Sequence, residues 1–349
     1  MVEFCSIDII IATLNSEKVL ETCLKSIKKQ NYPKNKIHLY ISDGGSTDNT
    51  LKIAKKYKCH IINNPLKTAE SAKAIALKKS NSELVSFIDS DNILPTKNFL
   101  QQLVHPLITN TTLVGSEPIA FTYRKNAGFI ERYSALIGAN DPYAFFTGVS
   151  DRKNYLNNRW TGIDNLQTKN HQNYIEIIFN HYSKIPTIGA NGTVYRRSFL
   201  NKLHIDKYLF DIDLLSQALK TNPKSEIHFA KVNNSIIHTY CESSIKKFIK
   251  KQKRRVVDLL EHNQNRQYSW NNNEFSFLIL IKNNFTFALY SFFIIPSLVD
   301  AIRGFLRKAD LAWFFHPIAC FITLIIYTYY FGLNILGIKL VQSRSTWSQ

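Results

Sequence analysis

The N-terminal part of the chain alternates between two hydrophobic periods. Short apolar runs of strand length occur at 7–13, 37–42, 59–62 and 83–88. Between these runs, apolar residues recur at helical spacing over 16–30, 46–57 and 68–79. Strands separated by helices of this length predict right-handed βαβ crossovers, and therefore an α/β fold with a mainly parallel sheet.

Beyond this part the pattern is less regular. Residues 120–183 are rich in Asn and Tyr and have one helix-like stretch at 127–137. We interpret them as an insertion that covers the functional site of the predicted α/β domain. Further strands are predicted at 185–195 and 227–238, with a short helix at 206–219 between them.

A basic amphipathic helix is predicted over 245–260, because its apolar residues fall on one helical face. The segment from Cys241 to Arg266 has eight Lys and Arg residues against three acids, a net charge of +5. Such a helix fits a membrane surface or the groove of a partner, and the alternative is a solvated helix packed on the domain.

Two apolar runs follow, at 285–302 and 311–338. A membrane span needs ~20 apolar residues, which the second run supplies and the first only marginally, because Pro296 and Asp300 interrupt it. The sequence therefore predicts a membrane-embedded region with one or two spans. The predicted divisions of the chain are a catalytic domain at 1–240, an interfacial segment at 241–275, the embedded region at 276–340 and a tail at 341–349.

The charge balance narrows the choice of partners. Lys and Arg number 44 against 26 Asp and Glu, which gives a net charge of +18 and favours a polyanionic partner. No nucleic-acid-binding motif is found and much of the charge flanks the apolar runs, so we expect a membrane and no nucleic acid. Five scattered cysteines without a CxxC pair favour a reducing compartment, so we expect the catalytic domain on the cytoplasmic side of the membrane.

Polar turns follow three of the predicted strands, after Thr13, Ser42 and Ile88. In parallel sheets the carboxyl ends of the strands form the ligand-binding edge. The third turn contains Asp89 and Asp91, whose side chains leave the strand end on the same side. Two carboxylates would repel a diphosphate unless a divalent cation bridged them, so this pair predicts a Mg²⁺ or Mn²⁺ site, with a plain turn as the alternative.

The segments ATLNSE, SDGGSTDNT and SFIDSDN, in this order, resemble glycosyltransferase family 2, the inverting GT-A enzymes that use nucleotide sugars. The resemblance implies a Rossmann-like GT-A fold and a nucleotide-sugar donor. It implies roles for Thr13 and Glu17 in the nucleotide pocket, Asp43 at the base (with uracil favoured), Lys73 near the diphosphate, Asp89 near the ribose and Asp91 on the metal. Thr13 and Glu17 also suit a helix start, and Asp43 also suits a turn.

Later segments match the family in part. The loop with Gly189, Asn191 and Gly192 resembles its acceptor-side loop, where glycine lets the backbone approach a sugar. The segment around Asp211 resembles the one that holds the general base. Because Phe210 stands where an acid is common, Asp213 remains the alternative base.

Two further matches concern charge. His238 lies where some GT-A enzymes have a metal-binding histidine, and a structural role is the alternative. Gln252, Arg254 and Arg255 resemble the QxxRW segment of membrane-bound members, although Val256 replaces the tryptophan. The two arginines would neutralise phosphate on the acceptor side, or simply face the membrane surface.

These observations predict a membrane-bound inverting glycosyltransferase acting on a lipid-linked saccharide or a polyprenyl phosphate. A sugar-1-phosphate nucleotidyltransferase is an alternative, but the turn after the first strand lacks the Gly- and basic-rich loop that it needs. The other alternative, an inactive nucleotide-binding membrane scaffold, is disfavoured by the intact Asp43, Asp89 and Asp91.

Overall fold

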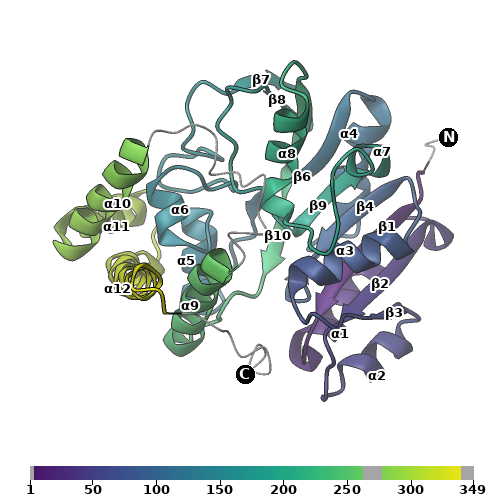
Figure 1. Ribbon diagram of the computed structural model, residues 1–349, viewed down its shortest axis with the longest axis horizontal. Helices are drawn as coiled ribbons and strands as arrows, with labels where there is room; N and C mark the ends of the chain where they lie inside the picture. Colours follow the sequence, from purple (N-terminus) through teal and green to yellow (C-terminus); the bar gives the residue numbers. More distant parts are fainter. Residues whose placement is uncertain (1–3, 262–276, 339–349) are drawn as a thin grey trace. The chain divides into compact units, whose positions relative to one another are not determined.

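The chain forms two compact units (Figure 1). The structure, a computed structural model, describes residues 4–261 and 277–338. Residues up to 119 and residues 165–238 form one unit, which we call the sheet unit. Residues 120–164 and the described residues from 239 onwards form the other, the helical unit. Residues 120–164 therefore group with the C-terminal helices, although the predicted catalytic domain includes them.

The sheet unit is built on one mixed sheet. Among the described residues its strand order is β3-β2-β1-β4-β9-β6-β10-β8-β7, and β5 pairs with β10 off this path. The strands are β1 (Ile7–Thr13), β2 (Ile37–Asp43), β3 (His60–Asn63), β4 (Leu84–Ile88), β5 (Asn92–Ile93), β6 (Leu113–Phe121), β7 (Gln167–Asn170), β8 (Tyr174–Phe179), β9 (Asn191–Arg196) and β10 (Ile227–His238). The first four long strands are parallel, as predicted, whereas β9 and β10 pair antiparallel with their neighbours. The prediction of a mainly parallel sheet is therefore right only for the N-terminal part.

Helices connect these strands in the expected alternation. They are α1 (Glu17–Lys28), η1 (Lys34–Lys36), α2 (Thr50–Lys56), α3 (Ala69–Lys79), α4 (Phe99–Thr109), α7 (Arg197–Leu200), η2 (Asp211–Asp213) and α8 (Leu214–Thr221). α1 buries Leu20, Leu24 and Ile27, which recur at helical spacing. α3 begins at a capping box, in which the Thr68 hydroxyl accepts from the backbone N–H of Ser71.

Three predicted elements differ from those observed. The helix expected over 46–57 begins only at Thr50, because the backbone N–H of Ser46 is held by Asp43 in the preceding turn. The strand expected over 185–195 is confined to β9, since Pro186 and the loop that follows it precede the pairing with β4. The helix expected over 206–219 is a single 3₁₀ turn, η2, followed by α8.

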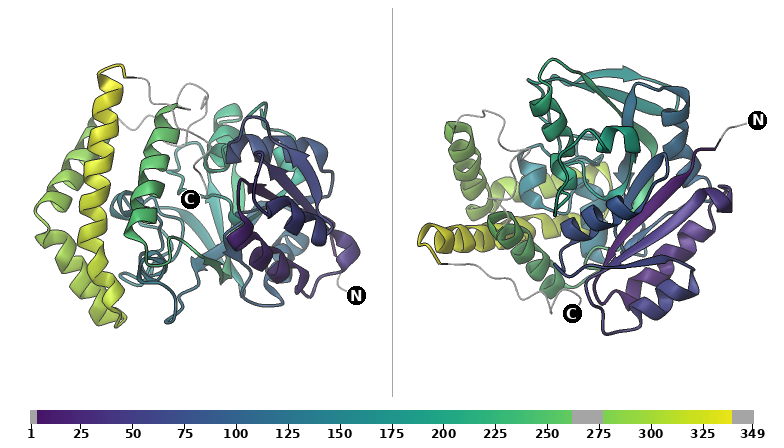
Figure 2. Two further views of the ribbon diagram at one scale, coloured as in Figure 1. Left: turned by 90° about the horizontal axis from the view of Figure 1, so that it is seen from below. Right: turned by 45° about the vertical axis from the view of Figure 1, so that its right-hand side comes forward.

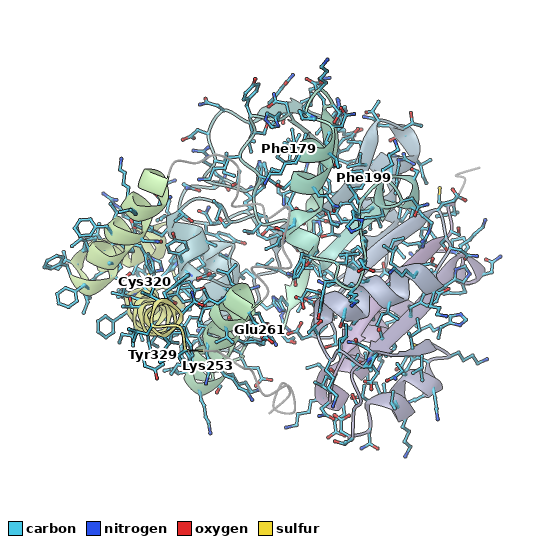
Figure 3. The ribbon with its side chains drawn as sticks, viewed as in Figure 1. Phe179, Phe199, Lys253, Glu261, Cys320 and Tyr329 are labelled. Carbon is cyan, nitrogen blue, oxygen red and sulfur yellow. The ribbon has the colours of Figure 1, made fainter. Side chains whose placement is uncertain are left out.

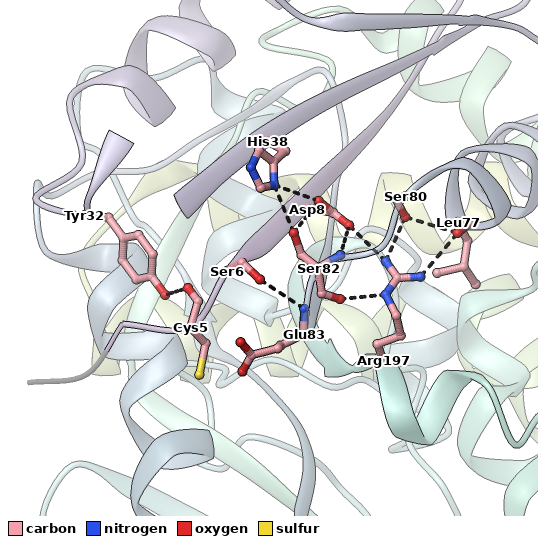
Figure 4. A network of polar contacts seen from close by, with 10 residues as sticks. All are labelled: Cys5, Ser6, Asp8, Tyr32, His38, Leu77, Ser80, Ser82, Glu83 and Arg197. Atoms are coloured by element: carbon pink, nitrogen blue, oxygen red, sulfur yellow. Dashed lines mark hydrogen bonds and ion pairs between the residues drawn. The ribbon is translucent and has the colours of Figure 1, made fainter. Parts of the chain in front are cut away.

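A buried carboxylate fastens the N-terminal ends of the sheet strands (Figure 4). Asp8, in β1, is fully buried and forms an ion pair with Arg197 at 2.9 Å. It also accepts from the backbone N–H and the hydroxyl of Ser82, at 2.7 and 2.6 Å, and contacts His38 at 3.2 Å. A buried charge needs such partners, and these join the segments before β4 and after β9 to β1.

The helical unit is assembled from two distant parts of the sequence. It contains α5 (Phe129–Ile137), α6 (Pro142–Phe146), α9 (Ile245–Glu261), α10 (Phe277–Phe292), α11 (Ile295–Arg307), η5 (Leu311–Phe314) and α12 (Phe315–Ile335). Its core joins α5, through Ile130, Tyr133 and Leu136, to Trp313 and Phe315 at the start of the C-terminal helix. Figure 2 shows α12, in yellow, alongside α9 and next to α10 and α11.

The two apolar runs fold differently. Residues Leu311–Ile335 form a helical stretch of 25 residues with mean hydropathy 1.8, which by length and composition can cross a membrane. The run 285–302 is not one helix: α10 and α11 meet at a bend of 77°. Pro296 lies in the first turn of α11, where the missing N–H is tolerated, so it marks the start of a new helix.

Candidate active site

Asp43, the last residue of β2, holds together the polar loops that follow β1 and β2. Its buried carboxylate accepts hydrogen bonds from the backbone N–H groups of Gly45 (2.9 Å) and Ser46 (2.7 Å). It also accepts from the hydroxyls of Thr13 (2.9 Å) and Ser46 (2.5 Å). Because each carboxylate oxygen has about two acceptor positions, these bonds occupy all of them. A base N–H therefore reaches Asp43 only when one of the two hydroxyls turns away.

The same two loops are joined a second time through Glu17. Its Oε2 accepts from the backbone N–H and the side-chain amide of Asn49, both at 3.0 Å. Asn15, with φ of 51°, accepts from the backbone N–H of Thr47 at 2.8 Å. Glu17 is also the first residue of α1, so it serves as the acid of a first helical turn while it binds the neighbouring loop.

The turn after β4 contains Asp89 and Asp91, between β4 and β5. β5 pairs antiparallel with the end of β10, so His238 lies opposite Asn92. This register brings His238 Nε2 to 3.3 Å from Asp91 Oδ2. The two residues that the sequence selects as metal ligands are therefore neighbours. Among the described residues, no group of three or more His, Cys, Asp or Glu side chains could hold a metal ion.

Asn92 fixes this turn and was not selected from the sequence. It is fully buried, and its Oδ1 accepts from the backbone N–H of Asp89 at 3.1 Å. Its amide donates to Asn191 Oδ1 at 3.0 Å. Asn92 thus ties the acidic turn to the loop before β9. A polar side chain at the end of an apolar strand was the available signal, but its partner is visible only in the fold.

Lys73 and Asp211, which are 138 residues apart in the sequence, form an ion pair with 2.7 Å between Nζ and Oδ1. Both side chains are largely shielded from solvent, with exposed fractions of 6% and 14%. Lys73 projects from α3, and the segment before Asp211 is fastened to the same helix, because the backbone N–H of Leu209 donates to the carbonyl of Glu70 at 3.0 Å. The contact between the predicted diphosphate residue and the predicted base follows from this docking.

The charges of this region are mutually dependent. Burial, and then the neighbouring carboxylate of Asp91, raise the pKa of Asp89 to about 6. Burial acts to lower the pKa of Lys73, but the carboxylates of Asp211, Glu70 and Asp89 outweigh it, so the pKa of Lys73 is raised. A buried ammonium surrounded by carboxylates stays protonated, and it compensates part of their negative charge.

The loop Gly189–Gly192 lies beside Asp211. A Cβ placed on Gly189 would lie 3.4 Å from Asp211 Oδ2, so glycine leaves the space in front of this carboxylate open. Gly192 has φ of +79°, and a Cβ there would lie 2.8 Å from the side chain of Ile236. Glycine is thus required at 192 by the backbone and the packing, and at 189 it keeps the approach to Asp211 clear.

Asp213 occupies a different environment from Asp211. It is the last residue of η2, directly before α8, and it is buried, with an exposed fraction of 6%. Residues two apart in a 3₁₀ helix of three residues per turn point in different directions. Asp211 is paired with Lys73 and lies next to the position that a Cβ on Gly189 would occupy.

The QxxR segment belongs to the helical unit. Gln252, on α9, is fully buried and its amide donates to the carbonyl of Asn140 at 3.1 Å. Arg255 donates to Gln252 Oε1 at 2.5 Å and lies 4.0 Å from Asp141. Gln252 and Arg255 thus connect α9 to the segment before α6. Arg254, which the sequence assigns with Arg255 to phosphate, is half-buried on the same helix.

Comparisons with known proteins identify the family of the chain. Residues 8–203 match the family described as Glycosyl transferase family 2. A poly(ribitol-phosphate) beta-N-acetylglucosaminyltransferase of Staphylococcus aureus is 36% identical over 92 residues, 25% of this chain and 16% of that protein. The chain thus spans less than a fifth of that relative's length in the match.

Two further proteins match along most of the chain. A dolichyl N-acetyl-alpha-D-glucosaminyl phosphate 3-beta-D-2,3-diacetamido-2,3-dideoxy-beta-D-glucuronosyltransferase of Methanococcus voltae is 24% identical over 348 residues, 94% of this chain and 97% of that protein. The solved structure of the mannosyltransferase PcManGT from Pyrobaculum calidifontis, in complex with GDP-Man and Mn²⁺, has a TM-score of 0.53 and 13% identity, covering 94% of this chain and 88% of that one. At this identity the second match concerns the fold alone.

Proposed function

Because the chain belongs to glycosyl transferase family 2 and is a glycosyltransferase, we propose that it is a membrane-attached, inverting member of that family. Its donor in this proposal is a nucleotide sugar, with a UDP-sugar favoured, and its acceptor is a lipid-linked saccharide or a polyprenyl phosphate. The observation that carries the proposal is the contact between Lys73 and Asp211 beside Gly189. It places a cation that could bind the donor diphosphate next to a carboxylate that could deprotonate the acceptor.

Asp91 and His238 would hold the divalent cation, Mg²⁺ or Mn²⁺. Their 3.3 Å separation fits two ligands of one ion, and a carboxylate with a neutral imidazole suits Mn²⁺. Because two protein ligands leave positions open, oxygens of the donor diphosphate would complete the set. When bound, the cation supplies Lewis-acid stabilisation of the leaving nucleoside diphosphate. The PcManGT complex with GDP-Man and Mn²⁺, on a similar fold, supports this pairing of metal and donor.

The nucleotide would lie on the loops after β1 and β2. Asp43 would accept the base N–H once the hydroxyl of Thr13 or Ser46 turns away, and hydroxyl rotation costs little. Asp89 would lie near the ribose. Lys73 would donate to the diphosphate while it remains beside Asp211.

Asp211 would act as the general base. A sugar hydroxyl is a poor nucleophile, so a carboxylate that takes its proton during attack on the anomeric carbon contributes to the rate. The proton moves to an Asp211 oxygen, the new glycosidic bond forms on the opposite face of the donor sugar, and the nucleoside diphosphate leaves. Asp213 is the less suitable base, because it is buried whereas Asp211 is only half-buried.

A lipid-linked acceptor is supported by two observations. The name of the Methanococcus voltae relative describes transfer to a dolichyl phosphate that already has a sugar. The helical unit contains a stretch of 25 residues that could cross a membrane. Such an acceptor offers a hydroxyl, for which Asp211 is needed, whereas a bare polyprenyl phosphate is already ionised. We place the sheet unit on the cytoplasmic side.

The proposal is tested by incubating the purified full-length protein with a panel of UDP- and GDP-sugars, Mn²⁺ and a lipid-linked saccharide, and measuring nucleotide release. We expect release from a UDP-sugar that depends on the acceptor. Release from no donor in the panel would contradict the proposal, and release from GDP-sugars alone would overturn the preference for uracil.

A further inference from the structure

The bend between α10 and α11 is an exposed apolar tip. It consists of Phe292, Phe293, Ile294 and Ile295, with exposed fractions of 65%, 60%, 47% and 70%. Turns in water are rich in Gly, Pro, Asn, Asp and Ser, and none of these is present in the tip. Ile294 has φ of 60°, which is an uncommon and strained conformation for a β-branched residue. We call these four residues the apolar tip.

α11 is packed with its small residues inwards and its large ones outwards. Ser297, Ala301 and Gly304 are buried, and a Cβ on Gly304 would lie 2.4 Å from the ring of Trp313. Leu298 and Leu306, on the other side, are exposed. A helix in water buries its large apolar side chains, whereas helices in lipid pack through small residues and present large ones to the acyl chains.

The charges of this hairpin are arranged by depth. Between Lys282 on α10 and Arg303 on α11, the only charged side chain is Asp300, which accepts from the Tyr290 hydroxyl at 2.8 Å. The α10 arm therefore extends about 15 Å from the tip to its first cation, and the α11 arm about 12 Å, at 1.5 Å per residue. That is close to the depth of one leaflet, about half of a ~30 Å hydrocarbon core. The basic residues lie where they would meet anionic headgroups.

α12 has two unlike faces. Its outer face continues that of η5, and together they have a stripe of exposed apolar side chains: Leu311 and Phe314 on η5, and Ile318, Phe321, Ile325 and Tyr329 on α12. Its inner face packs on α9, where the rings of Phe248 and Phe315 are 5.3 Å apart. Lys253 on α9, labelled in Figure 3, lies 5.4 Å from the ring of Tyr330. α9 is therefore packed against α12 within the helical unit.

This packing argues against a membrane crossing by α12. α9 has seven Lys and Arg residues between positions 246 and 255. If α12 crossed a ~30 Å hydrocarbon core, most of that basic helix would be drawn into it, at a high cost in free energy. If α12 instead lies along the surface, its apolar stripe faces the lipid and α9 stays on the aqueous side.

We propose that the helical unit binds one leaflet of an anionic bilayer without crossing it. In this arrangement the hairpin of α10 and α11 inserts with its apolar tip first, and α12 lies in the interface. The inference rests on the proposed membrane attachment and specifies its form. It is independent of the sugar-transfer chemistry.

Membrane binding is measured by flotation of the full-length protein with vesicles of phosphatidylcholine and phosphatidylglycerol in equal parts. We expect the wild type to float and Phe293→Ser to weaken its partitioning about tenfold, because an exposed aromatic ring no longer enters the lipid. Phe293→Trp should retain binding, and Tyr182→Ser, which removes a ring that is 91% exposed in the sheet unit, should leave it unchanged. Equal weakening by Phe293→Ser and Tyr182→Ser would overturn the role of the tip.

The form of attachment is measured with single cysteines in a Cys5→Ser/Cys59→Ser background. The reporters are Lys224→Cys in the sheet unit, Ala309→Cys after α11 and Ile338→Cys after α12, all at exposed positions. We expect an impermeant maleimide to modify all three from the same side of the vesicle. Protection of both Ala309→Cys and Ile338→Cys would mean that the bent pair alone crosses, and protection of Ile338→Cys alone would mean that α12 alone crosses. Protection of Ala309→Cys alone would mean that the bent pair and α12 both cross. Each of these results overturns this inference and leaves membrane attachment intact.

A third outcome separates the two proposals. If the full-length protein does not bind vesicles and forms dimers that protect Phe293→Cys from the reagent, a second copy covers the apolar surface. That result would contradict the membrane attachment itself, together with the inference drawn from it.

Discussion

At the scale of single residues, the contact between Lys73 and Asp211 links the two halves of the proposed chemistry. The sequence suggests each residue separately, from a family resemblance. It does not predict that they meet, because the contact depends on how the segment around Leu209 docks on α3. Asn92 was missed for the same reason, since its partner Asn191 is distant in the sequence. Which side chains surround a site could be anticipated here, but which of them are bonded could not.

Replacing the proposed base gives a prediction at this scale. Asp211→Asn keeps the shape and a hydrogen-bond acceptor for Lys73 but removes the basicity, so we expect turnover to fall by about 10²–10⁴-fold. Nucleotide-sugar affinity should change little. Steady-state kinetics with Asp213→Asn as the matched control should show a milder loss. The reverse ranking would assign the base to Asp213, and no effect from either would indicate an acceptor that is already ionised.

The metal gives a second prediction. Asp91→Ala should abolish transfer, and EDTA should abolish it reversibly in the wild type, because the proposed cation would lose its carboxylate ligand or be removed. Glu21→Ala, which removes an exposed acid of the same unit, is the control and should retain activity. Full activity of the wild type in chelator would contradict the metal site.

At the scale of elements, the hydrophobic period is a reliable guide where no specific polar contact competes with it. β1 and β10 have the predicted bounds, and both begin in a stretch of mostly buried positions. Predictions were wrong where a side chain diverts the backbone. Asp43 delays the start of α2, and the loop at Gly189 confines the strand predicted over 185–195 to β9. The sharp bend after Phe292 likewise divides a run that composition alone joins.

The buried ion pair at the start of β1 can be tested by stability. Arg197→Met leaves Asp8 without its cation while its carboxylate stays buried, so we expect the free energy of unfolding to fall by about 3 kcal/mol. Urea unfolding monitored by circular dichroism measures this. Lys56→Met, which breaks an exposed pair with Glu21, should leave the midpoint nearly unchanged. An equal effect of both substitutions would contradict the structural role of the Asp8 network.

At the scale of the whole molecule, the sequence pattern does not show which distant segments fold together. Residues 120–164 have little periodicity, and their place beside the C-terminal helices comes from apolar contacts between α5 and the residues around Trp313. The mixed sheet was likewise only partly predictable. β9 and β10 pair antiparallel with their neighbours, and the hydrophobic period of a strand does not reveal the direction of its neighbour.

The shared core of the helical unit predicts the effect of a truncation. A chain ending after residue 272 lacks α10, α11 and α12, and therefore exposes the apolar face of α5 that Trp313 and Phe315 cover. We expect aggregation, or rapid proteolysis within 120–164, by size-exclusion chromatography and limited digestion. A monodisperse, protease-resistant fragment would show that α5 does not need these helices.

We propose that this molecule transfers a sugar from a nucleotide donor to a lipid-linked hydroxyl, with Asp211 as the base. The most direct measurement follows a labelled sugar from the UDP-sugars onto a dolichyl-phosphate-linked saccharide, and determines the anomeric configuration of the product. We expect a product of inverted configuration from the wild type, and a large loss of that product with Asp211→Asn. A product with retained configuration, or full transfer by Asp211→Asn, would rule out this mechanism.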